Sequence, residues 1–159
     1  MKYVICFSSV SDDVINWSDS MKIDKYPQYK LYKFTKLLNI NKEKFQKPYT
    51  GKRAVNGTIV NRAYYSSYSY ALLWLEDHDF KLKQKWEYEV EGEEYVTEHQ
   101  QVRDALDDFK KKKVSKYLYE LHKLRKKADY KMHYPLTDKD AKKAMKYMEN
   151  IFAELKFKK

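Results

Sequence analysis

The sequence predicts an all-α protein, a bundle of roughly four to five helices into which a small β-hairpin is inserted. Over several long segments apolar residues recur three and four positions apart, which is the period of an amphipathic helix. Glycine and proline are scarce, with three of each in 159 residues, and this scarcity disfavours a turn-rich sandwich or barrel. One core suits a chain of this length, so we expect a helical bundle over residues 51–159 and a lead segment over residues 1–50 that packs on it.

The composition favours an anionic partner. Lys and Arg number 33 against 23 Asp and Glu, which gives a formal charge of +10. Such a balance fits RNA, DNA, a nucleotide or an acidic protein, although a lysine-rich surface can also serve solubility alone. The 16 tyrosines add aromatic faces of the kind on which single-stranded nucleic acid stacks.

Cysteine usage and hydropathy bear on the compartment. The single cysteine, Cys6, excludes an intramolecular disulfide framework and is compatible with a reducing cytosol. No apolar run is long enough for the core of a signal peptide or for a membrane span. We therefore expect a cytoplasmic protein without a membrane partner.

The lead segment has the weakest pattern. Residues 2–7 are rich in β-branched and aromatic types and predict a short strand. A helix is expected around residues 28–39, between Pro27 and Pro48. We expect the lead segment to form a layer on the bundle, and a partner surface is the alternative.

A long buried helix is predicted over residues 58–77. The stretch Asn56–Thr58 supplies capping residues, and a wide stripe of apolar and small residues follows it. Arg62 lies at the N-terminal end, where the free backbone N–H groups of a helix favour an anion. Arg62 and Tyr65 are therefore candidate nucleic-acid-binding residues, and an intramolecular salt bridge is the alternative role for Arg62.

The period changes after a break at Asp77–Phe80. Trp86, Tyr88 and Val90 alternate with charged residues, which indicates a strand. Glu91–Gly92 suits a tight turn, so we expect a small β-hairpin between two helices. Its acidic face is either solvated or docks against the basic surface of a second copy or another partner. That face holds Glu87, Glu89, Glu91, Glu93 and Glu94.

Three further helices are predicted in the C-terminal half of the chain. We expect them over residues 97–111, within the stretch 113–134, and over residues 137–156. In the first, His99 and Arg103 stand four residues apart and so share a face. A histidine on the same helix face as an arginine provides the two residue types that metal-independent RNA cleavage uses, although such a pair also arises by chance. The last helix begins at a variant of the capping box formed by Thr137 and Asp140.

Arg125 falls near the end of the second of these helices. Its planar guanidinium can donate a fork of hydrogen bonds to a phosphate. His122, His133, Asp129 and Tyr130 lie close to it in the sequence as candidate proton-handling or orienting groups. The plainer alternative is that Arg125 and Asp129, which are four residues apart, form a surface salt bridge.

Three segments together resemble a known family. They are NRAYYSSYSYALLWLE (residues 61–76), EHQQVRDAL (residues 98–106) and LRKKADYKMHYPLTDKDAKKAMKYMENIFAEL (residues 124–155). They resemble the prokaryotic branch of HEPN domains, in which an RAYY-type helix opens the bundle and an R-x-x-ADY segment precedes a final helix with spaced alanines. The resemblance covers roughly residues 51–155 and no part of the lead segment.

The resemblance implies a compact all-α bundle, commonly a homodimer, in toxin–antitoxin, abortive-infection or other antiviral defence systems. Many HEPN domains are metal-independent endoribonucleases. They need an Arg for the scissile phosphate and a His shortly after it for proton transfer, and they need no metal or cofactor. The positions at which that His is expected hold Asp129–Lys131 in this chain, and the nearest downstream histidine is His133.

The resemblance therefore implies an RNA-cleaving site with Arg125 on the phosphate and His133 as the first choice of general base, beside Asp129 and Tyr130. We expect the nucleic acid to be bound by Arg62, Tyr65, His99, Arg103, His122, Lys126 and Lys127. The alternative is a non-catalytic HEPN module that binds RNA or a nucleotide, or that serves as the partner of an antitoxin or effector protein. A third hypothesis is a structural interaction domain whose contact surface is the acidic hairpin.

Overall fold

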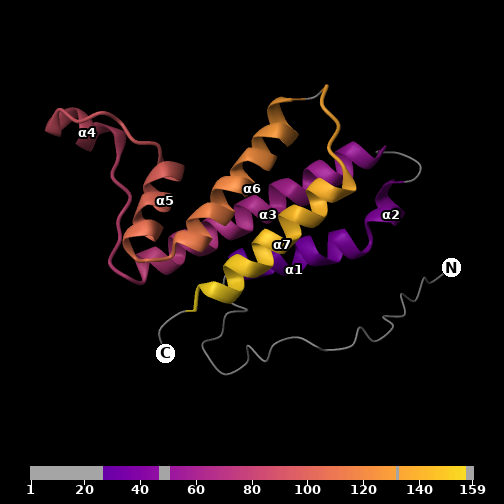
Figure 1. The fold of residues 1–159 in the computed structure, drawn as a ribbon. Helices are drawn as coiled ribbons and strands as arrows, with labels where there is room; N and C mark the ends of the chain where they lie inside the picture. Colours follow the sequence, from indigo (N-terminus) through magenta and orange to yellow (C-terminus); the bar gives the residue numbers. More distant parts are fainter. Residues whose placement is uncertain (1–26, 47–50, 132, 157–159) are drawn as a thin grey trace.

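The computed structural model describes residues 27–46, 51–131 and 133–156. These residues form seven helices and no strand (Figure 1). The helices are α1 (Pro27–Ile40), α2 (Lys42–Phe45), α3 (Gly51–Glu76), α4 (Lys85–Glu91), α5 (Glu98–Asp108), α6 (Lys112–Tyr130) and α7 (Asp138–Glu154). The all-α prediction is confirmed for this part of the chain. The strand expected at residues 2–7 lies outside the described residues.

The long helix α3 is the centre of the bundle. It packs mainly against α7, α1 and α6, so apolar residues are buried around most of its circumference. Small buried residues such as Ala63 and Ala71 allow the neighbouring helices to approach closely. At its C-terminal end the Tyr70 hydroxyl donates to the Leu155 carbonyl at 2.9 Å, and the Tyr70 ring stacks on Phe152 with the centroids 4.0 Å apart. These contacts tie α3 to the end of α7.

The start of α3 differs from the expected start. The helix begins at Gly51, and the residues expected to cap it, Asn56 and Thr58, lie inside it. Their side chains bond elsewhere: Asn56 Nδ2 donates to the Leu136 carbonyl at 3.1 Å, and Thr58 Oγ1 donates to the Ala54 carbonyl at 3.0 Å. Gly57 lies at the same contact, and a Cβ there would be 3.6 Å from Leu136 Cδ2, an ordinary van der Waals distance. Asn56 therefore fixes the α6–α7 loop against α3, whereas Thr58 bonds within its own helix.

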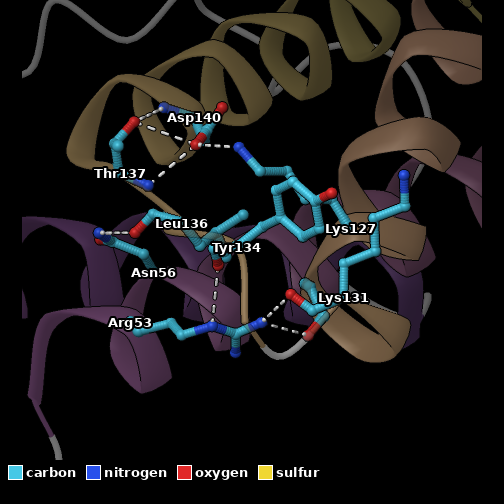
Figure 2. A network of polar contacts seen from close by, with 9 residues as sticks. Arg53, Asn56, Lys127, Lys131, Tyr134, Leu136, Thr137 and Asp140 are labelled. Carbon is cyan, nitrogen blue, oxygen red and sulfur yellow. Dashed lines mark hydrogen bonds and ion pairs between the residues drawn. The ribbon is translucent and has the colours of Figure 1, made fainter.

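Arg53 strengthens the same junction. Figure 2 shows its guanidinium reaching the end of α6, where Nη2 donates to the carbonyl oxygen of Lys131 at 3.1 Å and to that of Ala128 at 3.3 Å. Nε donates to the Tyr134 carbonyl at 3.3 Å. The last carbonyls of a helix have no partner within the helix, so Arg53 acts as a C-terminal cap for α6.

The predicted β-hairpin is wrong: residues 85–91 form the short helix α4. A capping box between Gln84 and Glu87 opens it, and Gly92 closes it in the left-handed conformation with φ of +68°. Trp86 and Val90, which alternation would place on a strand face, are four residues apart and share a helix face. Both ends of α4 thus carry helix signals, which outweigh an alternating pattern only a few residues long.

The remaining helices follow the sequence pattern. The box expected at the start of α7 is present, since Thr137 Oγ1 accepts from the Asp140 amide and Asp140 accepts from the Thr137 amide. The helix expected over residues 97–111 ends earlier, at Asp108, because Lys110 turns the chain with φ of +59°. At the other side of the bundle the ring of Tyr32 on α1 packs against the ring of Phe152, with the two ring centroids 4.4 Å apart. No helix in the described ranges combines the length and the apolar character that crossing a bilayer requires.

Candidate functional site

Three helices, α3, α5 and α6, bring together two histidines, two arginines and two tyrosines. We call this group the histidine–arginine cluster. It comprises Tyr64, Tyr68, His99, Arg103, His122 and Arg125. The helix period explains the grouping, because Tyr64 with Tyr68, His99 with Arg103, and His122 with Arg125 are each three or four residues apart on their own helix.

The two imidazoles lie against each other and against Tyr64. The ring centroids of His99 and His122 are 4.9 Å apart, and the His122 ring stacks on that of Tyr64 at 5.4 Å. The Tyr64 hydroxyl lies 2.8 Å from His99 Nδ1, a hydrogen bond that orients the imidazole. Tyr64 is fully buried, with 1 % of its surface exposed, so the core of the bundle fixes this arrangement.

Both histidines are held in the neutral form at neutral pH. The pKa of His122 is lowered to about 4, first by burial and then by the electrostatic effects of His99, Arg103, Lys126 and Arg125. Burial also lowers the pKa of His99, with Arg125 adding to the effect, while the carboxylate of Glu98 opposes it. A neutral imidazole has a lone pair and can accept a proton, and a bound anion beside it raises its pKa.

Arg125 is half-buried at the edge of the cluster. Its Nη2 donates to the Tyr65 hydroxyl at 3.0 Å, and its guanidinium lies over the rings of Tyr65 and Tyr130 at 5.6 and 5.4 Å. Nε lies 2.7 Å from Asp129 Oδ2, so the ion pair exists, and Asp129 also accepts from Asn61 Nδ2 at 2.8 Å. Asp129 and Asn61 therefore fix the position of the guanidinium.

Several polar atoms around the cluster are buried without an aligned hydrogen bond in the described part of the chain. They are Arg125 Nε, the Tyr68 hydroxyl and Asn61 Oδ1. Arg125 Nε is close to the Asp129 carboxylate but its N–H is not directed at the oxygen. A buried polar atom without a partner costs stability, so these atoms leave hydrogen-bonding capacity beside the two histidines.

Arg103 is the member of the cluster that lines the surface between α5 and α6. It donates to the Gln100 side chain, and its guanidinium lies 5.6 Å from the Tyr119 ring centroid. A hollow of about 520 Å³ opens there between α5 and α6, with Arg103, Lys112, Lys116 and Tyr119 in its wall. Arg103 thus connects the cluster to this hollow, whose wall also holds Asp104 and Asp107.

The structure unites most of the residues singled out in the sequence. His99, Arg103, His122 and Arg125 meet in the cluster, and Tyr65, Asp129 and Tyr130 contact Arg125. Arg62 is exposed on α3, and His133 is exposed in the turn that follows α6. Lys126 and Lys127 line a separate groove between α6 and α7.

Three members of the site were not singled out in the sequence. Tyr64 and Tyr68 belong to the apolar stripe of α3, and nothing in that stripe distinguishes a tyrosine that faces a histidine from one that only fills the core. Asn61 supports Asp129 across 68 positions of sequence, a contact that no local pattern reveals.

No protein-family model, no curated protein and no solved structure matches this chain. Within the described residues, no group of three or more His, Cys, Asp or Glu side chains is arranged to hold a metal ion.

Proposed function

We propose that this protein is a metal-independent endoribonuclease of the HEPN type and that the histidine–arginine cluster is its active site. The observation that carries the proposal is the pair of neutral imidazoles, 4.9 Å apart, with two guanidiniums beside them. Metal-independent RNA cleavage needs a base for the 2′-hydroxyl, an acid for the leaving group and cations for the phosphate. The cluster supplies one residue or more for each role.

In the proposed step the 2′-oxygen attacks the phosphorus and the bond from phosphorus to the 5′-oxygen breaks. His122 is assigned as the base that takes the 2′-hydroxyl proton, because its low pKa keeps it neutral. His99 is assigned as the acid: it takes up a proton from solvent when the phosphate binds, which Glu98 and the phosphate charge both favour, and then gives that proton to the 5′-oxygen. The products are a 2′,3′-cyclic phosphate and a 5′-hydroxyl.

The arginines stabilise the charge that develops on the phosphate oxygens. Arg125 is oriented by Asp129 and Tyr65, so it needs little reorganisation when the phosphate binds. The exposed ring of Tyr130, beside Arg125, provides a face for a neighbouring base. The resemblance of residues 51–155 to HEPN domains supports the same activity.

The test is cleavage of a single-stranded RNA by the full-length protein in excess chelator. We expect a 2′,3′-cyclic phosphate product, and a loss of about 10²–10³-fold in kcat for Arg125→Ala and for His122→Ala. His133→Ala is the matched variant, since the sequence singles out His133 as the base. If His133→Ala loses cleavage activity and His122→Ala keeps it, His133 and not His122 is the base. If all three variants still cleave RNA, the proposal is rejected.

A second candidate function is RNA or nucleotide binding without cleavage. The observation that favours it is the ion pair of Arg125 with Asp129, which occupies part of the guanidinium. Binding that weakens steeply with added salt while the RNA stays intact supports this candidate. A cyclic-phosphate product in chelator decides against it.

The HEPN resemblance also supports a homodimer that works in a defence or toxin–antitoxin system with an antitoxin or effector partner. The net charge of +10 favours an RNA target or an acidic partner. Sedimentation of the purified protein measures whether it is a homodimer. A monomer at the concentrations at which RNA is cleaved contradicts the dimer.

A further inference from the structure

A second cationic surface adjoins the histidine–arginine cluster, in the groove between α6 and α7. The groove encloses about 620 Å³, and five lysines and two acids line it, which leaves a net charge of five minus two, or +3. The buried side chain of Leu124 contributes to its floor. We call it the lysine groove. Its lysines are Lys123, Lys126, Lys127, Lys131 and Lys143.

The acids in the lysine groove engage only some of its lysines. Glu120 pairs with Lys123 at 3.0 Å and with Lys143 at 3.4 Å. Asp140 pairs with Lys127 at 3.1 Å, as Figure 2 shows, while it also holds the cap of α7. Lys126 and Lys131 take no part in these ion pairs, so the groove has cations to offer a ligand.

One lysine connects the groove to the cluster. Lys126 lines the groove, and its charge also helps to lower the pKa of His122. Arg125 directly precedes it on α6, and successive helix residues are turned by about 100° from each other. The two cationic surfaces therefore lie on adjoining sides of one helix.

The end of the groove carries an aromatic face. Tyr134 is 60 % exposed, and Lys131 Nζ lies 5.6 Å from its ring centroid. An exposed tyrosine beside lysines is a stacking platform for a base, whereas the carboxylates of an acidic segment have no aromatic face to stack on it. The chemistry of the groove thus favours nucleic acid over an acidic protein segment.

We propose that the lysine groove binds the sugar-phosphate backbone of the same RNA strand beyond the scissile phosphate, with a base on Tyr134. The proposal rests on the proposed function, and it names the substrate class as single-stranded RNA of several nucleotides rather than a free nucleotide or a dinucleotide. Packed helices lie about 8–10 Å apart, so the groove between them accepts one strand lengthwise and not a duplex.

The variant that tests this is Lys131→Gln with Lys143→Gln. The matched control is Lys142→Gln with Lys146→Gln, two lysines of the same helix region that line the hollow between α1 and α7 instead. We measure kcat/KM on a dinucleotide and on a strand of about twelve nucleotides. The advantage of the long strand over the dinucleotide is expected to fall about tenfold in the groove variant and to stay unchanged in the control variant.

Binding of a non-cleavable 2′-O-methyl strand separates this inference from the proposed function. We expect the slope of log affinity against log salt to decrease by about 1.4 in the groove variant, because each lost contact with a single strand is worth about 0.7. If the slope decreases in this way while the wild-type protein cleaves no RNA, the proposed RNA binding by the lysine groove is supported and the proposed nuclease activity is rejected. Two outcomes would overturn the proposal that the lysine groove binds RNA. One is cleavage in which the groove variant keeps the wild-type length advantage and salt slope. The other is a poly-glutamate peptide that displaces the strand more strongly than unlabelled RNA does.

Discussion

The histidine–arginine cluster and the segment around α4 are both rich in charged and aromatic residues, but they are held in different ways. The cluster stands on three helices whose apolar faces share one core, and its central tyrosine, Tyr64, is 1 % exposed. In Figure 1 α4 lies apart from the bundle, and Trp86 and Val90 on it are 63 % and 79 % exposed. Local contacts hold α4, among them its capping box and Lys83, which binds Glu91 and Glu93.

This difference is the reason that we propose an active site in the first region and not in the second. Tertiary packing can lower the pKa of His122 and fix an arginine beside it, because the supporting helices cannot move independently. The α4 segment has few contacts with the bundle, among them the hydrogen bonds between Gln101 of α5 and the backbone of Lys83, so we expect it to open at low cost. The predictions below test this contrast, from the largest expected effect to the smallest.

Truncation of a core leucine is expected to have the largest effect. Leu121→Ala on α6 removes a fully buried side chain next to His122, and the resulting cavity is expected to lower the free energy of unfolding by about 2–5 kcal/mol. Tyr88→Ala is the matched truncation on α4, where Tyr88 contacts Lys83 and Tyr95 of its own segment. We expect global stability to change by about 0.5 kcal/mol or less there. Urea unfolding measures both, and equal losses would place α4 inside the cooperative core.

The low pKa of His122 makes stability depend on pH. Above pH 6.5 the imidazole is neutral in both the folded and the unfolded state, so it has no effect. Between pH 6.5 and about 4 the unfolded state binds a proton that the folded state does not, so the free energy of unfolding falls as the pH falls. Below about pH 4 both states are protonated and the loss levels off.

Comparison with His122→Gln isolates this contribution from that of the carboxylates. Urea unfolding at a series of pH values is expected to give a shallower fall for the variant between pH 6.5 and 4. The NMR titration of the His122 ring gives the pKa directly, and added inorganic phosphate is expected to raise it. A pKa of His122 at its ordinary value would contradict the buried geometry of the cluster.

The sequence predicted the bundle well because its helices carry long repeated patterns. The apolar stripe of α6 and the capping box of α7 are local signals, and the structure confirms both. Residues 86–90 offered too few positions to separate the period of a strand from that of a helix, and Gln84 and Gly92 decided the outcome. The start of α3 was misplaced because Asn56 bonds to Leu136, which is 80 positions away.

The candidate site was predictable in its residue types and not in its grouping. The spacing along a single helix predicts that Arg125 lies beside Asp129 and that His99 shares a face with Arg103. The structure has the first pair on α6 and the second pair on the adjoining helix α5. The contact between His99 and His122 depends on how α5 packs on α6, and spacing within a helix contains no information about that packing. The sequence placed His133 among the groups near Arg125, and the resemblance made it the first choice of base; this stays a prediction that the His122→Ala and His133→Ala comparison tests.

Substitutions of two glycines, one in the bundle and one at the end of α4, are expected to change stability by smaller amounts. Gly57 lies inside α3, where an added Cβ would be in ordinary contact with Leu136 and Ala128, so Gly57→Ala is expected to raise stability by about 0.5–1 kcal/mol. Gly92 has φ of +68°, where a Cβ costs about 1–2 kcal/mol. Because α4 opens locally, Gly92→Ala is expected to lower the hydrogen-exchange protection of α4 amides and leave the melting temperature unchanged. A lower melting temperature in Gly92→Ala would show that α4 unfolds together with the bundle.

The smallest effect is expected at the exposed face of α4. Trp86 is 63 % exposed, and removing its ring in Trp86→Ala gives up little buried area, so the free energy of unfolding is expected to change by about 0.5 kcal/mol or less. Trp74 is the matched control, since its ring is 4 % exposed and its Nε1 donates to the Lys156 carbonyl at 2.9 Å. Trp74→Ala is expected to cost about 3–5 kcal/mol. A large loss in Trp86→Ala at low protein concentration would mean that α4 packs on the bundle, and a loss that appears only at high concentration would mean that another copy of the chain covers this face.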